Sequence, residues 1–165
     1  MKTFGGYLND KGIQHQIVEL WDKPVPYKLT VRGKQLYEYE FSVTTDVELL
    51  EYRVIFSLKE NVLWPTNTDE RLSYWSVSFE DHKGRYDVTG DAKEVVFQIF
   101  STVYAIIKDW IKKVKPEAFM FTADKSREVS RSKLYNKMVK SLKPSGYNLN
   151  VRSVQDENVY WFRKK

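Results

Sequence analysis

The sequence has no cysteine and only two histidines, His15 and His82, in its 165 residues. It therefore offers no disulfide, no thiol nucleophile and no cysteine-ligated zinc, and it suits a reducing compartment. The two histidines lack metal-ligand spacing, so we expect no metal site. No apolar run is long enough for a transmembrane helix, and the first residues lack the apolar run of a secretion signal. Neither a Gly-x-Ser-x-Gly elbow nor a phosphate-binding Walker loop is present.

The residues that are present have a globular composition. Hydrophobic residues make up 42% of the chain, aromatic residues 15% and charged residues 30%. A chain of this length can bury a core within one domain. No internal repeat, low-complexity tract or linker divides it, so we expect a single domain over residues 1–165.

Charge is divided unevenly along the chain. Residues 1–107 hold 12 basic and 16 acidic residues, whereas residues 108–165 hold 15 basic and 6 acidic residues. A basic carboxyl-terminal third attracts polyanions such as nucleic acid, an acidic protein surface or a phosphorylated small molecule. The same excess is also typical of a solvated surface, so charge alone leaves both interpretations open.

Three segments alternate between apolar and polar residues, which is the period of a strand with one buried face. They cover residues 37–44, 50–58 and 74–79, with a polar loop predicted around Trp64-Pro65-Thr66-Asn67-Thr68. This pattern predicts an antiparallel meander. Residues 1–35 are predicted to be irregular or to form an edge of the sheet.

A change of period follows these strands. From Val95 to Val114, apolar residues recur every three or four positions, which predicts a helix with a broad apolar face. Asp91 and Glu94 are typical of a helix amino terminus, and Pro116 ends the helix. Residues 118–121 form a short apolar run, the pattern of a strand that is covered on both faces.

The remaining residues complete the predicted sheet. A second helix is predicted over residues 126–142, followed by strands over residues 147–154 and 158–163 with a turn at Asp156-Glu157. The order is therefore strand, strand, strand, helix, strand, helix, strand, strand. It predicts an α/β (α+β) fold with a single mixed, mostly antiparallel sheet flanked by two main helices, one on each face.

This order resembles the acyl-CoA N-acyltransferase fold, the GNAT superfamily, over residues 36–163. In that family the turn after the fourth strand carries Gln/Arg-x-x-Gly-x-Gly/Ala, whose amides hold the coenzyme pyrophosphate at a helix amino terminus. Here the stretch is Asp87-Val88-Thr89-Gly90-Asp91-Ala92, so the resemblance implies coenzyme contacts at Gly90, Asp91 and Ala92. Asp87 stands where the family has Gln or Arg, and both aspartates repel a phosphate. Asp91 is either a helix cap or part of this cradle.

A second resemblance lies on the second predicted helix. Arg131-Ser132-Lys133-Leu134-Tyr135, followed by Gly146-Tyr147, is similar to the family pattern Asn-x-x-Ala-x-x-Leu-Tyr-x-x-x-Gly-Phe. If the chain is an acyltransferase, this similarity implies that Tyr135 is the general acid toward the departing thiolate, although its separation from Gly146 is longer than in the family. Tyr135 is otherwise a core residue of the helix. Gly90-Asp91-Ala92, Lys115-Pro116 and Arg131-x-x-Leu-Tyr135 also resemble small proteins of tailed phages.

Charged residues at two further places bear on a site. Arg127 and Arg131 fall on the apolar side of the second predicted helix, where an arginine pairs with a carboxylate or binds an anion. We therefore expect any ligand site to lie beside these arginines and the Gly90 turn. The acidic residues of the predicted strands are expected to lie on their polar, outward faces; these residues are Glu38, Glu40, Glu51 and Asp81.

Two functions from different classes follow from the sequence. The first is a non-catalytic, acyltransferase-like domain without a cofactor, acting as a phage or viral structural or binding protein. The alternative is a CoA-dependent N-acetyltransferase with acetyl-CoA as its cofactor. A protein partner or an assembling virion is expected, with nucleic acid as a further partner through the basic face, no membrane, and a location in the host cytoplasm or the virion. Partner contacts are predicted at Lys133, Lys137, Lys140, Arg163, Lys164 and Lys165.

Overall fold

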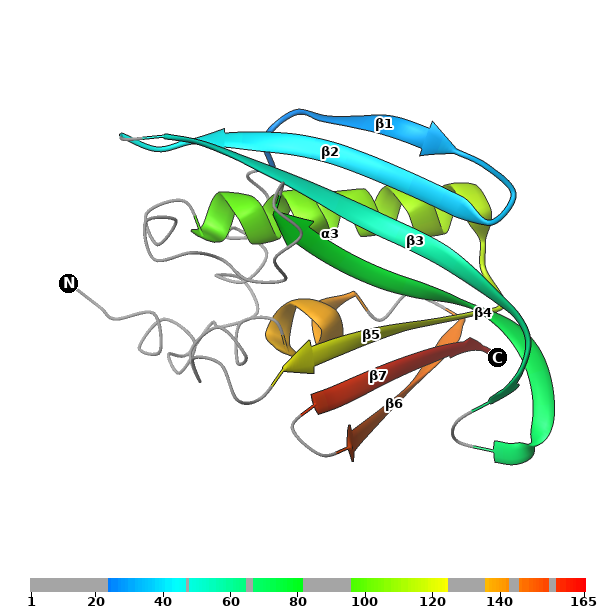
Figure 1. The fold of residues 1–165 in the computed structure, drawn as a ribbon. Coiled ribbons are helices and arrows are strands. Elements are labelled where there is room, and N and C mark those ends of the chain that lie inside the picture. The colour runs from blue at the N-terminus through cyan, green and yellow to red at the C-terminus, as the bar shows by residue number, and fades with distance from the viewer. Residues whose placement is uncertain are drawn as a thin grey trace.

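A computed structural model describes residues 24–46, 48–64, 67–81, 96–124, 136–142, 146–154 and 157–165 (Figure 1). The described elements are seven strands, one long helix and a helical segment at residues 136–141, called here the short helix. In chain order they are β1 (Tyr27–Arg32), β2 (Leu36–Thr44), β3 (Leu49–Trp64), β4 (Asn67–Asp81), α3 (Val96–Val114), β5 (Ala118–Asp124), the short helix, β6 (Tyr147–Val154) and β7 (Glu157–Lys164).

All seven strands belong to one sheet, in the order β1-β2-β3-β4-β5-β7-β6. The pair β4 and β5 is parallel, and the other neighbouring pairs are antiparallel. The predicted single mixed sheet of an α+β fold is therefore confirmed. A parallel neighbour needs a crossover connection, and α3 lies within that connection between β4 and β5.

The meander has one strand more than the alternating pattern predicts. Strand β1 lies within residues 1–35, and it begins directly after Pro26, because proline lacks the donor that a strand ladder needs. A short turn joins it to β2, closed by a hydrogen bond of 2.8 Å from the Gly33 amide to the Leu36 carbonyl. This part of the segment forms the edge of the sheet beside β2.

Two turns are tighter than predicted. Strand β3 runs to Trp64 and β4 begins at Asn67, so the loop predicted at residues 64–68 is largely strand. Shifts of register between Lys59 and Trp64 allow this extension, with Asn61 at a φ of 51°. At the other end of the chain, Glu157 pairs with Val154 and belongs to β7 rather than to the turn.

Helix α3 packs its apolar stripe on the sheet. Trp110 lies at the centre, with its ring stacked on Phe56 at a centroid distance of 4.2 Å and edge-on to Trp75 at 5.4 Å and to Phe119 at 5.9 Å. The helix ends at Val114, where Lys115 has a φ of 49°, the left-handed conformation that commonly closes a helix. The predicted cap, Asp91, lies outside the described residues.

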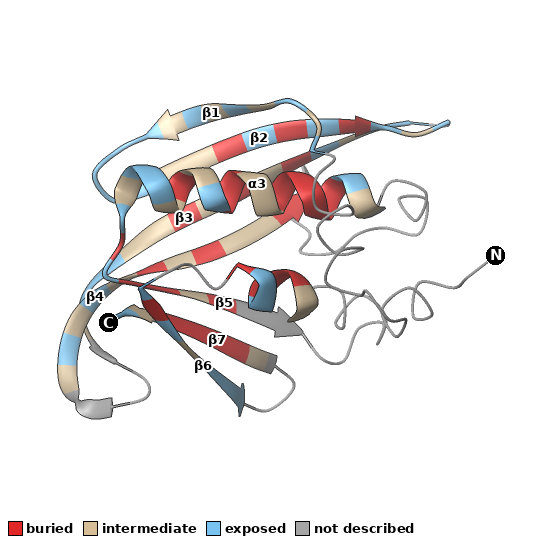
Figure 2. Ribbon diagram, turned by 180° about the vertical axis from the view of Figure 1, so that it is seen from behind, coloured by how far each residue is buried: buried red, intermediate tan, exposed pale blue. Residues whose placement is uncertain are grey.

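Both described helices cover the same face of the sheet (Figure 2). Met138, Val139 and Leu142, at the short helix and its end, join the same buried cluster as the α3 stripe. The Tyr160 hydroxyl of β7 donates to Asn136 Oδ1 at 2.5 Å on this face. The prediction of one helix on each face is therefore wrong for these two helices. The buried side chains of β5 and β7 that pack against the short helix belong to the same cluster, on the same face of the sheet, as those that pack against α3.

Strand β1 is attached to α3 by polar contacts. The Tyr27 hydroxyl donates to Asp109 Oδ2 at 3.0 Å, and the Val25 amide donates to Thr102 Oγ1 at 2.9 Å. Burial, helped by the hydrogen bond to Asp109, raises the pKa of Tyr27 to about 12. These contacts fix the edge strand on the helix as well as on β2.

The first prediction concerns Trp110. Its replacement by alanine should lower the free energy of unfolding by about 3–5 kcal/mol, because the side chain is fully buried between α3 and the face of the sheet. Urea unfolding measures the loss. Lys112→Ala, on the exposed side of the same helix, should change it by less than about 0.5 kcal/mol. A Trp110→Ala protein as stable as the parent would contradict this packing.

The second prediction concerns the Tyr27–Asp109 contact. Tyr27→Phe keeps the ring and removes the hydroxyl, and it should cost about 1 kcal/mol at neutral pH. Tyrosine in an unfolded chain has a pKa near 10 and Tyr27 in the folded protein about 12, so the contribution is complete below pH 10 and is lost between pH 10 and 12. Unfolding measured across that range should show the parent and variant converging. A difference that stays constant to pH 12 would contradict the assignment.

Candidate functional site

The two parallel strands separate towards their carboxyl ends (Figure 1). Their pairing covers three residue pairs, from Trp75 with Phe119 to Val77 with Phe121. Strand β4 nevertheless continues to Asp81 and β5 to Asp124. We call residues 78–81 and 122–124 together the β4–β5 fork. In sheets with parallel strands, ligands bind outside the carboxyl ends of such strands, so the fork is the first candidate site.

The β4 side of the fork carries two buried carboxyl residues. Glu80 is 4% exposed and Asp81 is 7% exposed. Glu80 accepts a hydrogen bond of 2.5 Å from Arg53 Nε, and a second guanidinium nitrogen of Arg53 forms an ion pair with it. This contact raises the pKa of Arg53 above its usual range. Because Arg53 neutralises Glu80 directly, the carboxylate is tolerated in a position with little access to water.

Asp81 lies on the opposite side of β4 from Glu80. It pairs in register with Tyr52 and continues the phase of Trp75, Val77 and Phe79, which faces α3. The prediction that Asp81 belongs to the outward polar face is therefore wrong. Asp81 occupies a position of the alternating pattern whose other members are buried, and this signal in the sequence was missed. No comparable signal marks Glu80, because its burial depends on a contact with the neighbouring strand.

All of the predicted cofactor-binding and catalytic residues lie outside the described residues. These are Gly90, Asp91, Ala92, Arg127, Arg131 and Tyr135. The described chain ends at Asp81 before the first group and resumes at Asn136 after the second. Coenzyme contacts at the Gly90 turn and a general acid at Tyr135 therefore stay predictions.

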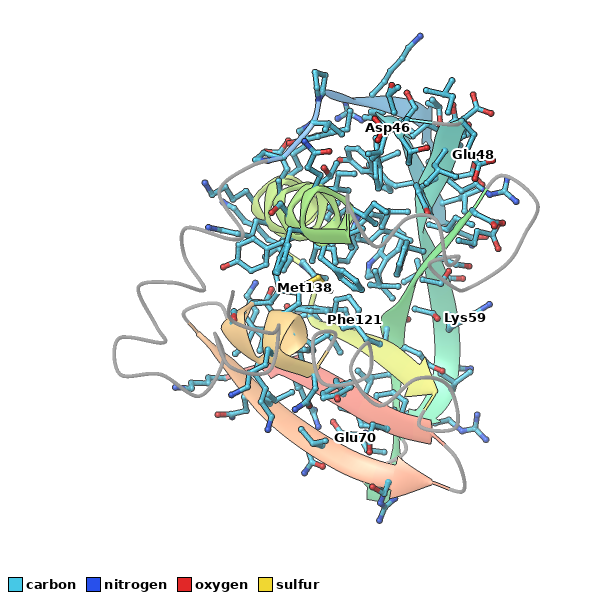
Figure 3. The ribbon with its side chains drawn as sticks, turned by 90° about the vertical axis from the view of Figure 1, so that its left-hand side faces the viewer. Asp46, Glu48, Lys59, Glu70, Phe121 and Met138 are labelled. Carbon is cyan, nitrogen blue, oxygen red and sulfur yellow. The ribbon has the colours of Figure 1, made fainter. Side chains whose placement is uncertain are left out.

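The described partner residues of the prediction come from two elements. Lys137 and Lys140 lie on the short helix (Figure 3, beside Met138), which packs against Tyr160 near the middle of β7, whereas Lys133 lies outside the described residues. The carboxyl-terminal residues lie instead beside the start of β5, where the Lys164 amide donates to the Glu117 carbonyl at 2.8 Å.

One of these tail residues is already bound within the chain. Arg163 Nη1 donates to Glu70 Oε2 at 2.7 Å, and Arg163 Nη2 donates to the other carboxylate oxygen of Glu70. This two-point contact lowers the pKa of Glu70. Lys164 Nζ lies 3.9 Å from Glu117 Oε1, a longer contact on an exposed surface. Lys165 follows it at the end of the described chain.

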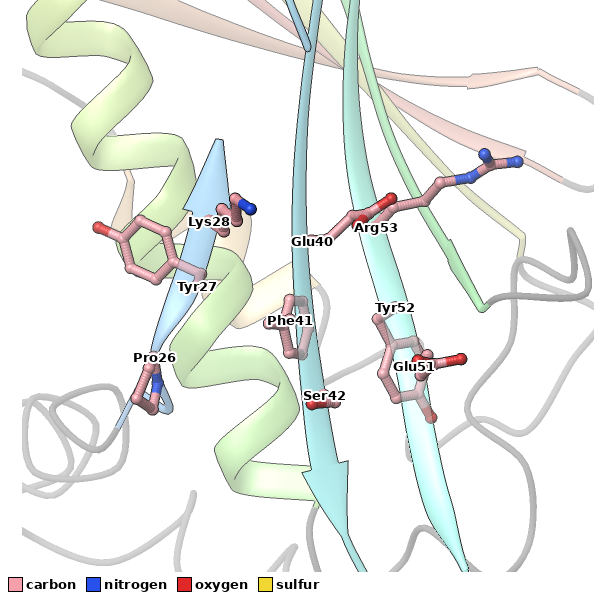
Figure 4. Close-up of a pocket in the computed structure, with 9 residues that line it drawn as sticks. All are labelled: Pro26, Tyr27, Lys28, Glu40, Phe41, Ser42, Glu51, Tyr52 and Arg53. Atoms are coloured by element: carbon pink, nitrogen blue, oxygen red, sulfur yellow. The ribbon is translucent and has the colours of Figure 1, made fainter. Parts of the chain in front are cut away.

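A shallow hollow of about 520 Å³ lies over the first three strands (Figure 4). Its charged lining residues come from the outward face, and their signs alternate across neighbouring strands in register: Lys28 of β1 opposite Glu40 of β2, and Glu40 opposite Arg53 of β3. Arg53 in turn faces Glu80 of β4. Each charge of this row therefore has an opposite neighbour, whereas Glu51, the remaining charged residue of the lining, lies opposite Ser42 of β2.

Three further findings concern metal ligands, membrane-spanning helices and related proteins. Among the described residues, no group of carboxylates and imidazoles could hold a metal ion, and both histidines lie outside them. Within the same part of the chain, no helix is both long and apolar enough to span a bilayer. No model of a protein family matches the sequence, and a search of curated proteins finds no significant match.

The third prediction tests the Arg53–Glu80 pair. Arg53→Gln should lower the free energy of unfolding by about 1–3 kcal/mol, because it leaves the buried Glu80 carboxylate without its cationic partner. Lys59→Gln, an exposed change on the same strand, is the matched control. The double variant Arg53→Met with Glu80→Leu should recover most of the loss, since no charge stays buried. Equal stability of Arg53→Gln and Lys59→Gln would show that Glu80 does not depend on Arg53.

Proposed function

We propose that the chain is a non-catalytic, acyltransferase-like domain that acts as a structural or binding protein of a phage, in the host cytoplasm or in the virion. The arrangement of the sheet supports the acyltransferase-like part of this proposal. A meander is followed by a helix, a parallel strand, a second helix and a final pair of strands, and the only described parallel pair separates at its carboxyl end. That is the place at which the family resemblance puts a coenzyme.

The acidic end of β4 is the observation that carries the non-catalytic part. Glu80 and Asp81 are buried immediately before the loop that contains Asp87 and Asp91. A carboxylate about 5 Å from a phosphate is repelled by about 3 kcal/mol at an effective dielectric constant near 20. The hydrogen bond and the ion pair of Arg53 are both made with Glu80, so these donors are not available to an incoming phosphate. Because Glu80 is neutralised by Arg53, the expected repulsion of the coenzyme A pyrophosphate comes from the aspartates that follow this strand, Asp87 and Asp91.

A CoA-dependent N-acetyltransferase is the second candidate, and the β4–β5 fork favours it. Two adjacent parallel strands that separate over 78–81 and 122–124 leave backbone groups there without a partner on the facing strand. An extended ligand could pair with such groups. In this alternative Tyr135 is the general acid, and the amides near Gly90 hold the pyrophosphate.

Acetyl-CoA separates the two candidates and provides the fourth prediction. A ligand at 100 times its dissociation constant stabilises the folded protein by about 2.7 kcal/mol. For a chain of this size that corresponds to a rise of roughly 5–10 °C in melting temperature. We expect no such rise with acetyl-CoA at millimolar concentration, and no release of free thiol when amines are added.

The control is Asp91→Asn, which caps a helix as well as aspartate does but removes one negative charge from the loop. If charge repulsion excludes the coenzyme, this variant should gain acetyl-CoA affinity without losing stability. A rise in the melting temperature of the parent, with thiol release that disappears in Tyr135→Phe, would overturn the proposal in favour of the acetyltransferase.

A further inference from the structure

Basic residues from three separate segments lie at one end of the molecule. The end of β1 with its turn into β2, the end of α3, and the end of β7 all lie at the right-hand side of Figure 1 and at the left-hand side of Figure 2. We call their exposed basic residues the basic end. They are Arg32, Lys34, Lys112, Lys113, Lys115, Lys164 and Lys165.

Contacts within the fold hold these segments together. Lys113 Nζ of α3 lies 5.9 Å from the centroid of the Tyr39 ring of β2. Arg32 of β1 pairs in register with Tyr37 of β2, two residues from Tyr39. The amides of Lys164 and Lys165 donate to the carbonyls of Glu117 and Gly146, both at 2.8 Å. The positive charges are therefore presented on ordered backbone.

The positive charge of the basic end exceeds what its neighbouring carboxylates neutralise. Asp109 accepts the Tyr27 hydroxyl and Glu60 accepts a side-chain amide hydrogen of Gln35 at 3.3 Å, and both keep their negative charge, but together with Glu117 they are three carboxylates beside seven basic residues. Glu117 is itself largely exposed, and it lies 3.9 Å from Lys164. A helix favours cations in its last turn, but this accounts for Lys112 and Lys113 alone. The other five basic residues come from a strand, turns and the tail.

We propose that the basic end binds the phosphate backbone of double-stranded nucleic acid without reading its sequence. This inference rests on the binding role in the proposed function and not on the absence of catalysis. Exposed lysine and arginine side chains on rigid segments suit the evenly spaced phosphates of a duplex. Single strands are usually held by exposed aromatic rings, but Tyr39 and Tyr147 near this end are buried, and Tyr37, which pairs with Arg32, is partly buried.

A charge-removal series provides the fifth prediction. The test variant carries Lys112→Gln, Lys115→Gln and Lys165→Gln, and the matched control carries Lys28→Gln, Lys137→Gln and Lys140→Gln, with the same loss of net charge away from the basic end. Binding is measured by fluorescence anisotropy with a labelled DNA duplex of mixed sequence over a range of salt concentrations. The parent should bind with an affinity that falls steeply with salt. The test variant should bind about tenfold or more weakly, with a log–log salt slope smaller by about 2–3, since each phosphate contact contributes about 0.9.

The control variant should bind the duplex as the parent does. Equal weakening of both variants would overturn the basic end as the binding surface, as would a parent that does not bind the duplex at low salt. Tighter binding to a single strand of the same length would overturn the duplex as the partner. Acetyl-CoA turnover would refute the non-catalytic proposal but would leave these binding results unaffected, so the two failures are distinguishable.

Discussion

Trp110 lies where the four-stranded meander meets the three strands β5, β7 and β6, and its ring contacts aromatic side chains of both parts. Phe56 and Trp75 lie on one side and Phe119 on the other. Phe119 continues the contact to β7 by stacking on Phe162 at 4.7 Å. Because only three residue pairs join β4 to β5, this aromatic packing holds the two parts of the sheet together to a large extent. Within the described structure, Trp110 Nε1 has no hydrogen-bond partner, a cost that the burial of the ring outweighs.

Features that depend on local periodicity could be predicted from the sequence. The alternating pattern of β2, β3 and β4 arises because one face of each strand is buried. The apolar stripe of α3 likewise arises because one face of the helix is buried. Strand β6 matches its predicted range of residues 147–154 for the same reason. Strand β1 was missed because Pro24 and Pro26 make its surroundings look irregular, and because its pairing is decided by the neighbouring strand.

Features that depend on relations between segments could not be predicted. Nothing in the pattern of residues 136–142 says which face of the sheet they cover, because that depends on how β5 and β7 are placed beside β4. The burial of Glu80 depends on Arg53, which the register of β3 and β4 brings opposite. For the candidate site, the sequence predicted ligand contacts in the loop after β4, which stay a prediction. The burial of Glu80 and Asp81 at the end of that strand could be seen only in three dimensions.

Among the described residues, the carboxylates at the ends of β2 and β4 lie on the opposite side of the molecule from the basic end. Asp46 and Glu48 lie near the turn between β2 and β3 (Figure 3), and Glu80 and Asp81 end β4 at the same side of the molecule. The basic end lies at the other side, and it combines residues of the acidic first part of the sequence, Arg32 and Lys34, with those of the basic last part. Helix α3 runs from the acidic side to the basic side, so its dipole is aligned favourably with both.

The order of the strands also decides which edge of the sheet is exposed while the chain folds. Strands β1 to β4 pair with their neighbours in sequence, whereas β5 reaches β4 only across α3. Closing a longer segment costs more chain entropy, so we expect the meander to form before β5 joins it. Until then the outer edge of β4 is open and could pair with another copy of the chain. Glu80 and Asp81 lie at the end of this temporary edge, and charged residues there oppose such aggregation.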